Sequence, residues 1–277
     1  MIQRFACVIA FLLAMPIGPA SAQDQPAATE SFPFEDGVIT ITENADFEKV
    51  LAFDGEELAR NFYVSFDNTV EVAGVNVALV SIGDGGNMCG PYSLIIWKPE
   101  GEDLKTQAVG DEDCGAPSPA VTGDSIYYVP YLVPGASGTV QVWTPETGLG
   151  VAGSISYTPQ PGTRWRDFDP GIGHILDAMK NADIYAASKK LLGKRLTDVV
   201  DGLMVGSGPE PTSSRIYYAK GCVPHNCGGN DAFMGIDPAK QRLYFARQQD
   251  NKGIEAWPPV KSWPKDLRAA MEELLRR

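Results

Sequence analysis

The chain has 277 residues, of which 44% are apolar, and it carries a formal net charge of −12. This length fits one or two globular domains. The acidic surplus excludes charge-driven binding to nucleic acid, because the phosphate backbone would be repelled. The charge is uneven: residues 23–165 contain 21 acidic and five basic residues, a net charge of −16, whereas residues 166–277 carry +3. The first half therefore suits a basic partner, although an acidic surface also keeps an exported protein soluble.

The first 22 residues have the pattern of a secretory signal peptide. Arg4 supplies the positive charge, an apolar stretch follows at residues 5–15, and Ala20-Ser21-Ala22 forms a small-residue cleavage site. We expect a mature chain that starts near Gln23 and a periplasmic or secreted location. The apolar stretch is short for a bilayer span, and no later one reaches about 18 residues, so no transmembrane segment is expected.

Residues 23–158 form the first expected domain, and their pattern is that of an all-β fold, either a sandwich or a barrel. Short β-branched and aromatic segments alternate with turns rich in glycine and proline. The expected strands are residues 61–66, 75–82, 93–97, 125–129 and 139–143. The sequence shows no convincing internal repeat in this half. Its motifs do not indicate a particular family, and it is interpreted as an accessory domain.

A second domain is expected over residues 172–277, after a linker rich in proline and glycine at residues 159–171. Residues 183–192 have the pattern of a short helix that Gly193 ends, and Pro264 opens an amphipathic C-terminal helix. The expected strands between the two helices are residues 216–219, 232–236 and 242–246, the last two joined by a turn at residues 237–240. This mixture predicts an α+β domain with an antiparallel sheet and flanking helices.

Five cysteines are present, and Cys7 leaves with the signal peptide. An even number remains, which suggests two disulfides in an exported protein. The remaining cysteines are Cys89, Cys114, Cys222 and Cys227. They allow three connectivities, and the spacing favours Cys89–Cys114 and Cys222–Cys227, one bridge in each half.

The strongest candidate for a binding site is a short segment between two expected strands. Its residues are Cys222, Val223, Pro224, His225, Asn226 and Cys227. Two cysteines separated by four residues can close a small ring, and Pro224 restricts both its own backbone and that of Val223. The ring is therefore stiff and carries one imidazole, that of His225, near its apex. A rigid protruding loop loses little conformational entropy on binding.

This segment resembles the loop Cys-Lys-Pro-His-Asp-Cys of the Ivy (inhibitor of vertebrate lysozyme) family, which lies on an exported α+β domain of similar length. The resemblance implies that the loop enters the active-site cleft of c-type lysozyme. His225 would sit between the catalytic carboxylates, with Cys222 and Cys227 as the clip and Pro224 as the stiffening residue. Two positions depart from the family's loop. Val223 replaces lysine and Asn226 replaces aspartate, which predicts weaker binding if that aspartate pairs with a lysozyme cation.

The implied position of the histidine fits the chemistry of a glycosidase cleft. Glycosidase carboxylates flank the scissile bond and leave room for sugar and water. An imidazole between them can donate a hydrogen bond to each, and a protonated one makes charge-assisted bonds in a site that excludes water. The ring would also block the sugar subsite physically.

Other interpretations of this loop stay open. It can be a structural staple that carries an incidental histidine. A thioredoxin-like redox site has two residues between its cysteines, and this segment has four. A zinc site would find at most three ligands in the ring, and the second histidine, His174, fits a packed or surface position better than a ligand position.

The rest of the sequence gives little support for a catalytic or calcium-binding motif. Two histidines and the absence of Gly-x-Ser-x-Gly argue against a hydrolase triad. Asp84-Gly-Gly-Asn87 fits a turn better than a calcium loop, because it lacks the longer series of ligands. We therefore expect no enzyme activity, no cofactor and no metal.

The leading hypothesis is an exported inhibitor of c-type lysozyme with an accessory β domain. The alternative is a periplasmic binding module for cell-envelope glycan or another envelope protein, in which the loop recognises a different target. No nucleic acid is expected as a partner. Formation of a homodimer is left as an open alternative.

Overall fold

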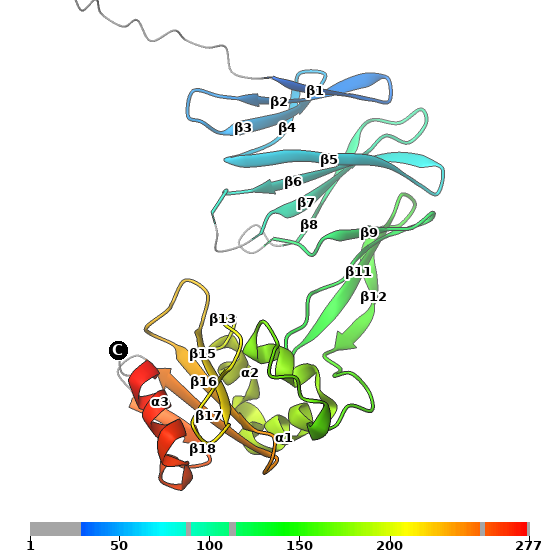
Figure 1. The fold of residues 1–277 in the computed structure, drawn as a ribbon. Coiled ribbons are helices and arrows are strands. Elements are labelled where there is room, and N and C mark those ends of the chain that lie inside the picture. The colour runs from blue at the N-terminus through cyan, green and yellow to red at the C-terminus, as the bar shows by residue number, and fades with distance from the viewer. Residues whose placement is uncertain (1–28, 87–89, 111–114, 250–252, 276–277) are drawn as a thin grey trace, which may run out of the picture.

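The computed structural model describes residues 29–86, 90–110, 115–249 and 253–275. Three four-stranded antiparallel sheets are followed by a six-stranded antiparallel sheet with helices (Figure 1). The predicted signal peptide, Cys89 and Cys114 lie outside the described residues. None of the helices in the described part of the chain is long and apolar enough to cross a membrane.

The first domain consists of three consecutive β meanders, each with its strands in sequence order. The first meander contains β1 (Glu30–Phe34), β2 (Gly37–Glu43), β3 (Lys49–Phe53) and β4 (Glu56–Asn61). The second contains β5 (Tyr63–Val72), β6 (Val75–Gly83), β7 (Tyr92–Trp97) and β8 (Lys105–Val109). The third contains β9 (Pro119–Val121), β10 (Ile126–Tyr128), β11 (Ser137–Thr144) and β12 (Gly148–Ser156). The sheets are stacked in layers (Figure 1), which confirms the all-β prediction and reveals a repetition that the sequence hides.

The middle sheet is buried on both faces. On β6, Ala78 and Val80 pack against the first sheet, whereas Val77 and Leu79 pack against the third. Trp97 meets Trp143 of the third sheet edge to face, with ring centroids 5.0 Å apart. Double burial explains why β6 and β7 are almost continuously apolar rather than alternating.

The second domain is an α+β fold, as predicted. Its sheet contains β13 (Val205–Gly206), β14 (Glu210–Pro211), β15 (Tyr217–Cys222), β16 (Asp231–Asp237), β17 (Arg242–Gln249) and β18 (Gly253–Trp257). Its α-helices are α1 (Ala182–Leu192), α2 (Leu196–Asp201) and α3 (Lys265–Leu275). Short 3-10 helices lie at Trp165–Asp167, Ile175–Lys180, Gly193–Arg195 and Val260–Ser262.

Helices cover both faces of this sheet (Figure 1). Met234 and Phe245 pack with residues of α1 and α2, whereas Phe233 and Tyr244 pack with Leu267 and other residues of α3. All seven residues of the central strand β16 are buried as a result. A strand covered on both sides is a rigid base for the loops at its two ends.

The first predicted helix begins and ends close to the expected residues, and the second begins where Pro264 predicted. The Asn181 side chain accepts hydrogen bonds from the backbone N–H groups of Asp183 and Ile184, at 3.1 and 3.2 Å, and so caps α1. Gly193, with φ +53°, follows the last residue of α1. The segment Lys265–Leu275 follows Pro264 directly. Gly193 and Pro264 were therefore correct signals in the sequence, whereas the Asn181 cap was not predicted.

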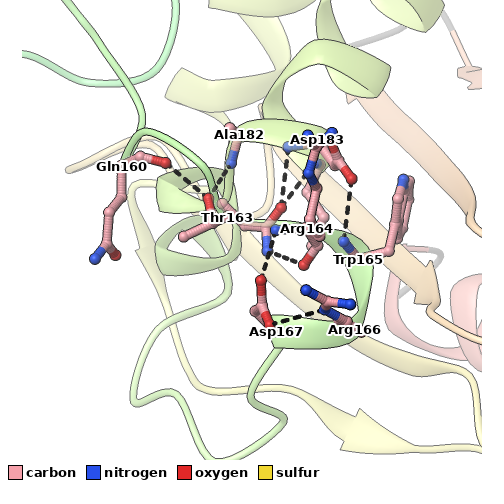
Figure 2. Close-up of polar contacts among 10 residues, drawn as sticks. Gln160, Thr163, Arg164, Trp165, Arg166, Asp167, Ala182 and Asp183 are labelled. Atoms are coloured by element: carbon pink, nitrogen blue, oxygen red, sulfur yellow. Dashed lines mark hydrogen bonds and ion pairs between the residues drawn. The ribbon is translucent and has the colours of Figure 1, made fainter.

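The segment predicted as a linker, residues 159–171, is held against the start of α1 (Figure 2). Thr163 Oγ1 accepts a hydrogen bond from the Ala182 N–H at 2.7 Å, and the Asn181 side-chain amide donates to the Arg164 carbonyl at 2.6 Å. Arg164 also forms an ion pair with Asp183 at 3.4 Å. This segment therefore packs as part of the second domain, while the exact domain boundaries stay a prediction.

Aromatic packing continues across the same junction. The Tyr157 ring lies 5.1 Å from that of Tyr185 on α1, and burial raises the pKa of Tyr157 to about 12. Val133, between β10 and β11, packs against the core of the second domain. A Cβ atom at Gly135 would lie 2.9 Å from a methyl group of Leu196, so the backbone approaches α2 closely there. The third meander and the second domain therefore share a packed contact.

Candidate functional site

The Cys222–Cys227 segment lies at one end of the buried strand β16, in the loop that joins β15 to β16. Cys222 is paired with Asp231 at the end of the ladder, so residues 223–230 form the loop. Cys222 and Cys227 form the predicted disulfide, with their Cα atoms 4.9 Å apart. Cys222 is buried and Cys227 is exposed. One side of the ring is therefore fixed in the sheet while the other projects from it.

A tight turn forms the apex of the ring. The Asn226 N–H donates to the Val223 carbonyl at 3.0 Å, which places Pro224 and His225 at the two corners. His225 has φ +60°, and proline followed by a positive φ is the pattern of a type II turn. Pro224, His225 and Asn226 are all exposed.

The backbone of His225 is held in an unfavourable region. Glycine or asparagine normally occupies the left-handed position of such a turn, and a larger side chain costs about 1 kcal/mol or more there. Backbone outliers of this kind persist where the surroundings enforce them, and they cluster at functional sites. A ring closed by a disulfide can enforce this one and hold the imidazole at the apex.

The base of the loop is anchored by a buried carboxylate. Asp231 is only 4% exposed, and it accepts hydrogen bonds from the Gly228 N–H at 2.7 Å and the Lys220 ammonium at 3.2 Å. Lys220 also donates to the Leu274 carbonyl at 3.2 Å, near the end of α3. The loop is thus connected to the sheet and to a helix. Sequence reasoning missed Asp231, although a charged residue in an otherwise apolar strand was a usable signal.

An apolar residue flanks the ring. The short strand β13 pairs with β15, and Val205 lies directly opposite Cys222. Val205 is 49% exposed, which makes it one of the more exposed large apolar residues of the second domain. Sequence reasoning missed this neighbour because the contact depends on a two-residue strand that no periodicity predicts.

The remaining candidates have local structural roles. His174 caps the 3-10 helix Ile175–Lys180, with Nδ1 accepting from the Leu176 N–H at 3.2 Å. Asp84 accepts a hydrogen bond from the Gly86 N–H at 2.8 Å, the geometry of an Asx turn, while Asn87 lies outside the described residues. Within the described ranges no three His, Cys, Asp or Glu side chains gather as a metal site would require.

The Cys89–Cys114 pairing stays a prediction. The described residues next to both cysteines lie side by side, because the Ala116 N–H donates to the Pro91 carbonyl at 3.0 Å. A Cβ atom at Gly115 would overlap the carbonyl of Gly90. This proximity supports the predicted bridge, which peptide mapping without reduction would test.

Comparison with known families identifies both domains. The model of the inhibitor of vertebrate lysozyme (Ivy) family matches residues 183–277, the part that contains the disulfide-closed loop. The C-terminal domain is therefore an Ivy domain, as the loop sequence indicated. The model of the Y4bG N-terminal domain matches residues 35–156, the part that forms the three stacked meanders.

A relative that is similar over most of its length identifies the family of the whole chain. The uncharacterized protein y4bG of Sinorhizobium fredii (strain NBRC 101917 / NGR234) is 30% identical over 230 residues, which cover 81% of this chain and 84% of that protein. The chain belongs to the y4bG family. No solved structure matches it significantly.

Proposed function

We propose that this protein is an exported inhibitor of c-type lysozyme that inserts its Cys222–Cys227 loop into the active-site cleft. The observation that carries the proposal is the combination of an Ivy domain with an exposed, disulfide-closed ring whose turn has His225 at its corner. In this proposal the protein acts by binding and has no catalytic activity of its own.

The geometry of the ring supports binding without much rearrangement. The disulfide, Pro224 and the Asp231 anchor restrict the loop from three sides. A loop that is already ordered loses little entropy when it enters a cleft, so more of the contact energy appears as affinity. The left-handed backbone at His225 directs one side chain from the apex.

His225 is the proposed anchor in the cleft. Its two ring nitrogens can donate to the two carboxylates that a glycosidase places on either side of the scissile bond. Both bonds become charge-assisted when the imidazole is protonated, and water is excluded by the inserted ring. The imidazole then occupies the space that the sugar and the attacking water require.

The neighbours of His225 set the strength of the contact. Val223 and Asn226 lack the charges that the Ivy loop has at these positions, so the contact depends more on shape and apolar area. Val205, 49% exposed beside the ring, can supply apolar area at the rim of the cleft. We propose that this surface partly offsets the lost charges.

The first domain has a proposed accessory role. Residues 23–165 carry a net charge of −16, and an acidic body attracts a cationic partner before contact. The first domain would then raise the rate of association, while the loop determines the contact itself.

A lysozyme panel tests the proposal directly. Purified mature protein, starting at Gln23, is assayed for inhibition of c-type, g-type and phage lysozymes. We expect inhibition of c-type lysozyme, because the loop is matched to its pair of carboxylates. Inhibition of none of the three, with the disulfide intact by mass spectrometry, would refute the proposed function.

A further inference from the structure

The middle and third sheets of the first domain do not cover each other completely. At one end of their interface Leu79, Ile95 and Trp143 form a closed apolar core. At the other end the same face of the middle sheet is polar, because Ser81 on β6 lies opposite Ser93 on β7. The third sheet leaves a cavity of about 410 Å³ over this polar end. We call it the sheet-end pocket.

A β-bulge supplies the pocket with two further polar side chains. The β5–β6 register passes from the pair Phe66–Val80 to the pair Asn68–Leu79, so Asp67 is an extra residue. Phe66 packs toward the first sheet, whereas Asn68 is opposite a residue that faces the third. The bulge therefore places consecutive side chains, those of Asp67 and Asn68, on the pocket side. Bulges that re-aim side chains in this way are frequent beside functional sites.

The polar groups of the pocket are held in place by one another. The Ser81 hydroxyl donates to the Asp67 carboxylate at 2.7 Å. The Ser93 hydroxyl is 3.0 Å from the Tyr128 hydroxyl, and these two residues are 5% and 0% exposed. Hydrogen-bonded side chains on a sheet whose opposite face is packed form an ordered floor, which lowers the entropic cost of binding a small ligand.

The chemistry of the lining restricts the ligand. The lining residues carry one carboxylate, one amide and four hydroxyls, which offer several acceptors and donors. No cationic side chain is among the described lining residues, so an anion would be repelled by Asp67. A single carboxylate is too few for Ca²⁺ or Mg²⁺, which take six or more oxygen ligands. Pro91, Pro117 and Pro119 add apolar walls.

We propose that the sheet-end pocket binds one unit of a neutral saccharide. Adjacent hydroxyls of a sugar can donate to Asp67 and exchange hydrogen bonds with Asn68, while its C–H face lies against the proline walls. A cavity of this volume is within the usual range for small-ligand sites. The site is in a different domain from the loop, and it does not depend on the proposed inhibition of lysozyme.

NMR titration of the full mature chain tests this site. Cellotriose and chitotriose are added separately at millimolar concentration, and backbone amide shifts are followed. We expect saturable shifts with at least one of them, confined to amides around Asp67, Ser81 and Ser93. Asp67→Asn and Asn68→Ala should each weaken the fitted affinity at least about tenfold, as loss of a central hydrogen-bonding group predicts.

Glu71→Gln is the matched control, because Glu71 is an exposed carboxylate on the same strand and does not line the pocket. It should leave the affinity within about twofold of wild type. If Asp67→Asn does not give a folded spectrum, Asn68→Ala alone decides. The proposal is overturned if neither trisaccharide shifts these amides, if the shifts lie elsewhere, or if Glu71→Gln weakens binding as much as the pocket variants.

Discussion

The two loops at the ends of β16 are anchored alike but project very differently. Asp231 begins the strand and Asp237 ends it, each is 4% exposed, and each accepts a hydrogen bond from a backbone N–H of its loop. Each loop also contains one residue other than glycine with a positive φ, His225 at +60° and Gln241 at +53°.

The difference between the loops is length and covalent closure. The β16–β17 loop has four residues, 238–241. The backbone N–H and the side-chain ammonium of Lys240 lie 2.9 and 3.4 Å from the carboxylate oxygens of Asp237. The β15–β16 loop has eight residues, 223–230, and a disulfide closes its first part. The aspartate anchor is therefore common to both ends of this strand. The disulfide-closed part of the longer loop is the part to which we assign the binding of lysozyme.

Exchanging the loops should have the largest effect. In a variant with Cys222→Ser, residues 223–230 are replaced by Pro-Ala-Lys-Gln, the sequence of the other turn. The sheet should still form, because the β15–β16 pairing and the Lys220–Asp231 contact remain, but inhibition of c-type lysozyme should fall at least about 100-fold because the central contact is gone. Inhibition constants and thermal unfolding measure the two properties. A folded variant that inhibits like wild type would show that the loop is only a connection.

Opening the ring should have an intermediate effect. The double variant Cys222→Ser with Cys227→Ser keeps His225 but frees the loop, so about tenfold weaker inhibition is expected from the lost pre-organisation. The ring spans only five positions, so the loss of stability should be small. Inhibition constants and denaturant unfolding are measured together. A large loss of stability without a change in inhibition would make the disulfide a structural staple.

Substitutions of the two aspartates should separate effects on stability from effects on inhibition. Asp231→Ala and Asp237→Ala should each lower the free energy of unfolding by about 1–2 kcal/mol, because each removes a buried carboxylate that accepts a hydrogen bond from its loop. Only Asp231→Ala should also weaken inhibition, since only that aspartate anchors the ring. Urea unfolding and inhibition assays give both quantities, and Glu210→Ala, an exposed acidic residue of the same sheet, is the control. Equal losses of inhibition would contradict the distinction between the loops.

Removal of negative charge from the first domain should have the smallest effect, and it should change the rate of association. Four exposed glutamates are changed to glutamine, namely Glu30, Glu56, Glu71 and Glu100. Association with a cationic c-type lysozyme should slow several-fold at low salt and converge with wild type at high salt, where the Debye length is short. Stopped-flow rates at several salt concentrations decide. A rate deficit that persists at high salt would exclude electrostatic steering.

Those parts of the fold that depend on local sequence patterns could be predicted from the sequence. The apolar pattern of residues 183–192, Gly193 after α1 and Pro264 before α3 are local signals, and they predicted the bounds of α1 and the start of α3 within about one residue. The apolar runs of β6 and β7 were equally readable. These elements are determined by residues close to one another in the chain.

What the sequence hid depends on distant partners. The first meander was missed because its strands are buried on only one side, and β4, Glu-Glu-Leu-Ala-Arg-Asn, has the charged composition of a helix or loop. The packing of the proline- and glycine-rich segment at 159–171 was also hidden, because Thr163 and the Arg164 carbonyl form hydrogen bonds with residues at the start of α1. The loop motif was predictable, whereas its Asp231 anchor and its Val205 neighbour required the sheet register.

The most direct measurement compares two asparagine substitutions at the left-handed positions of the two loops. Asparagine tolerates this backbone conformation, so His225→Asn removes the imidazole and leaves the turn intact, and Gln241→Asn is the matched control. If His225 is the central anchor, His225→Asn should inhibit c-type lysozyme at least about 30-fold more weakly than wild type, the equivalent of about 2 kcal/mol, with a free energy of unfolding no lower than that of wild type. Gln241→Asn should inhibit like wild type. Equal inhibition by His225→Asn and wild type would contradict the insertion of His225 into the cleft.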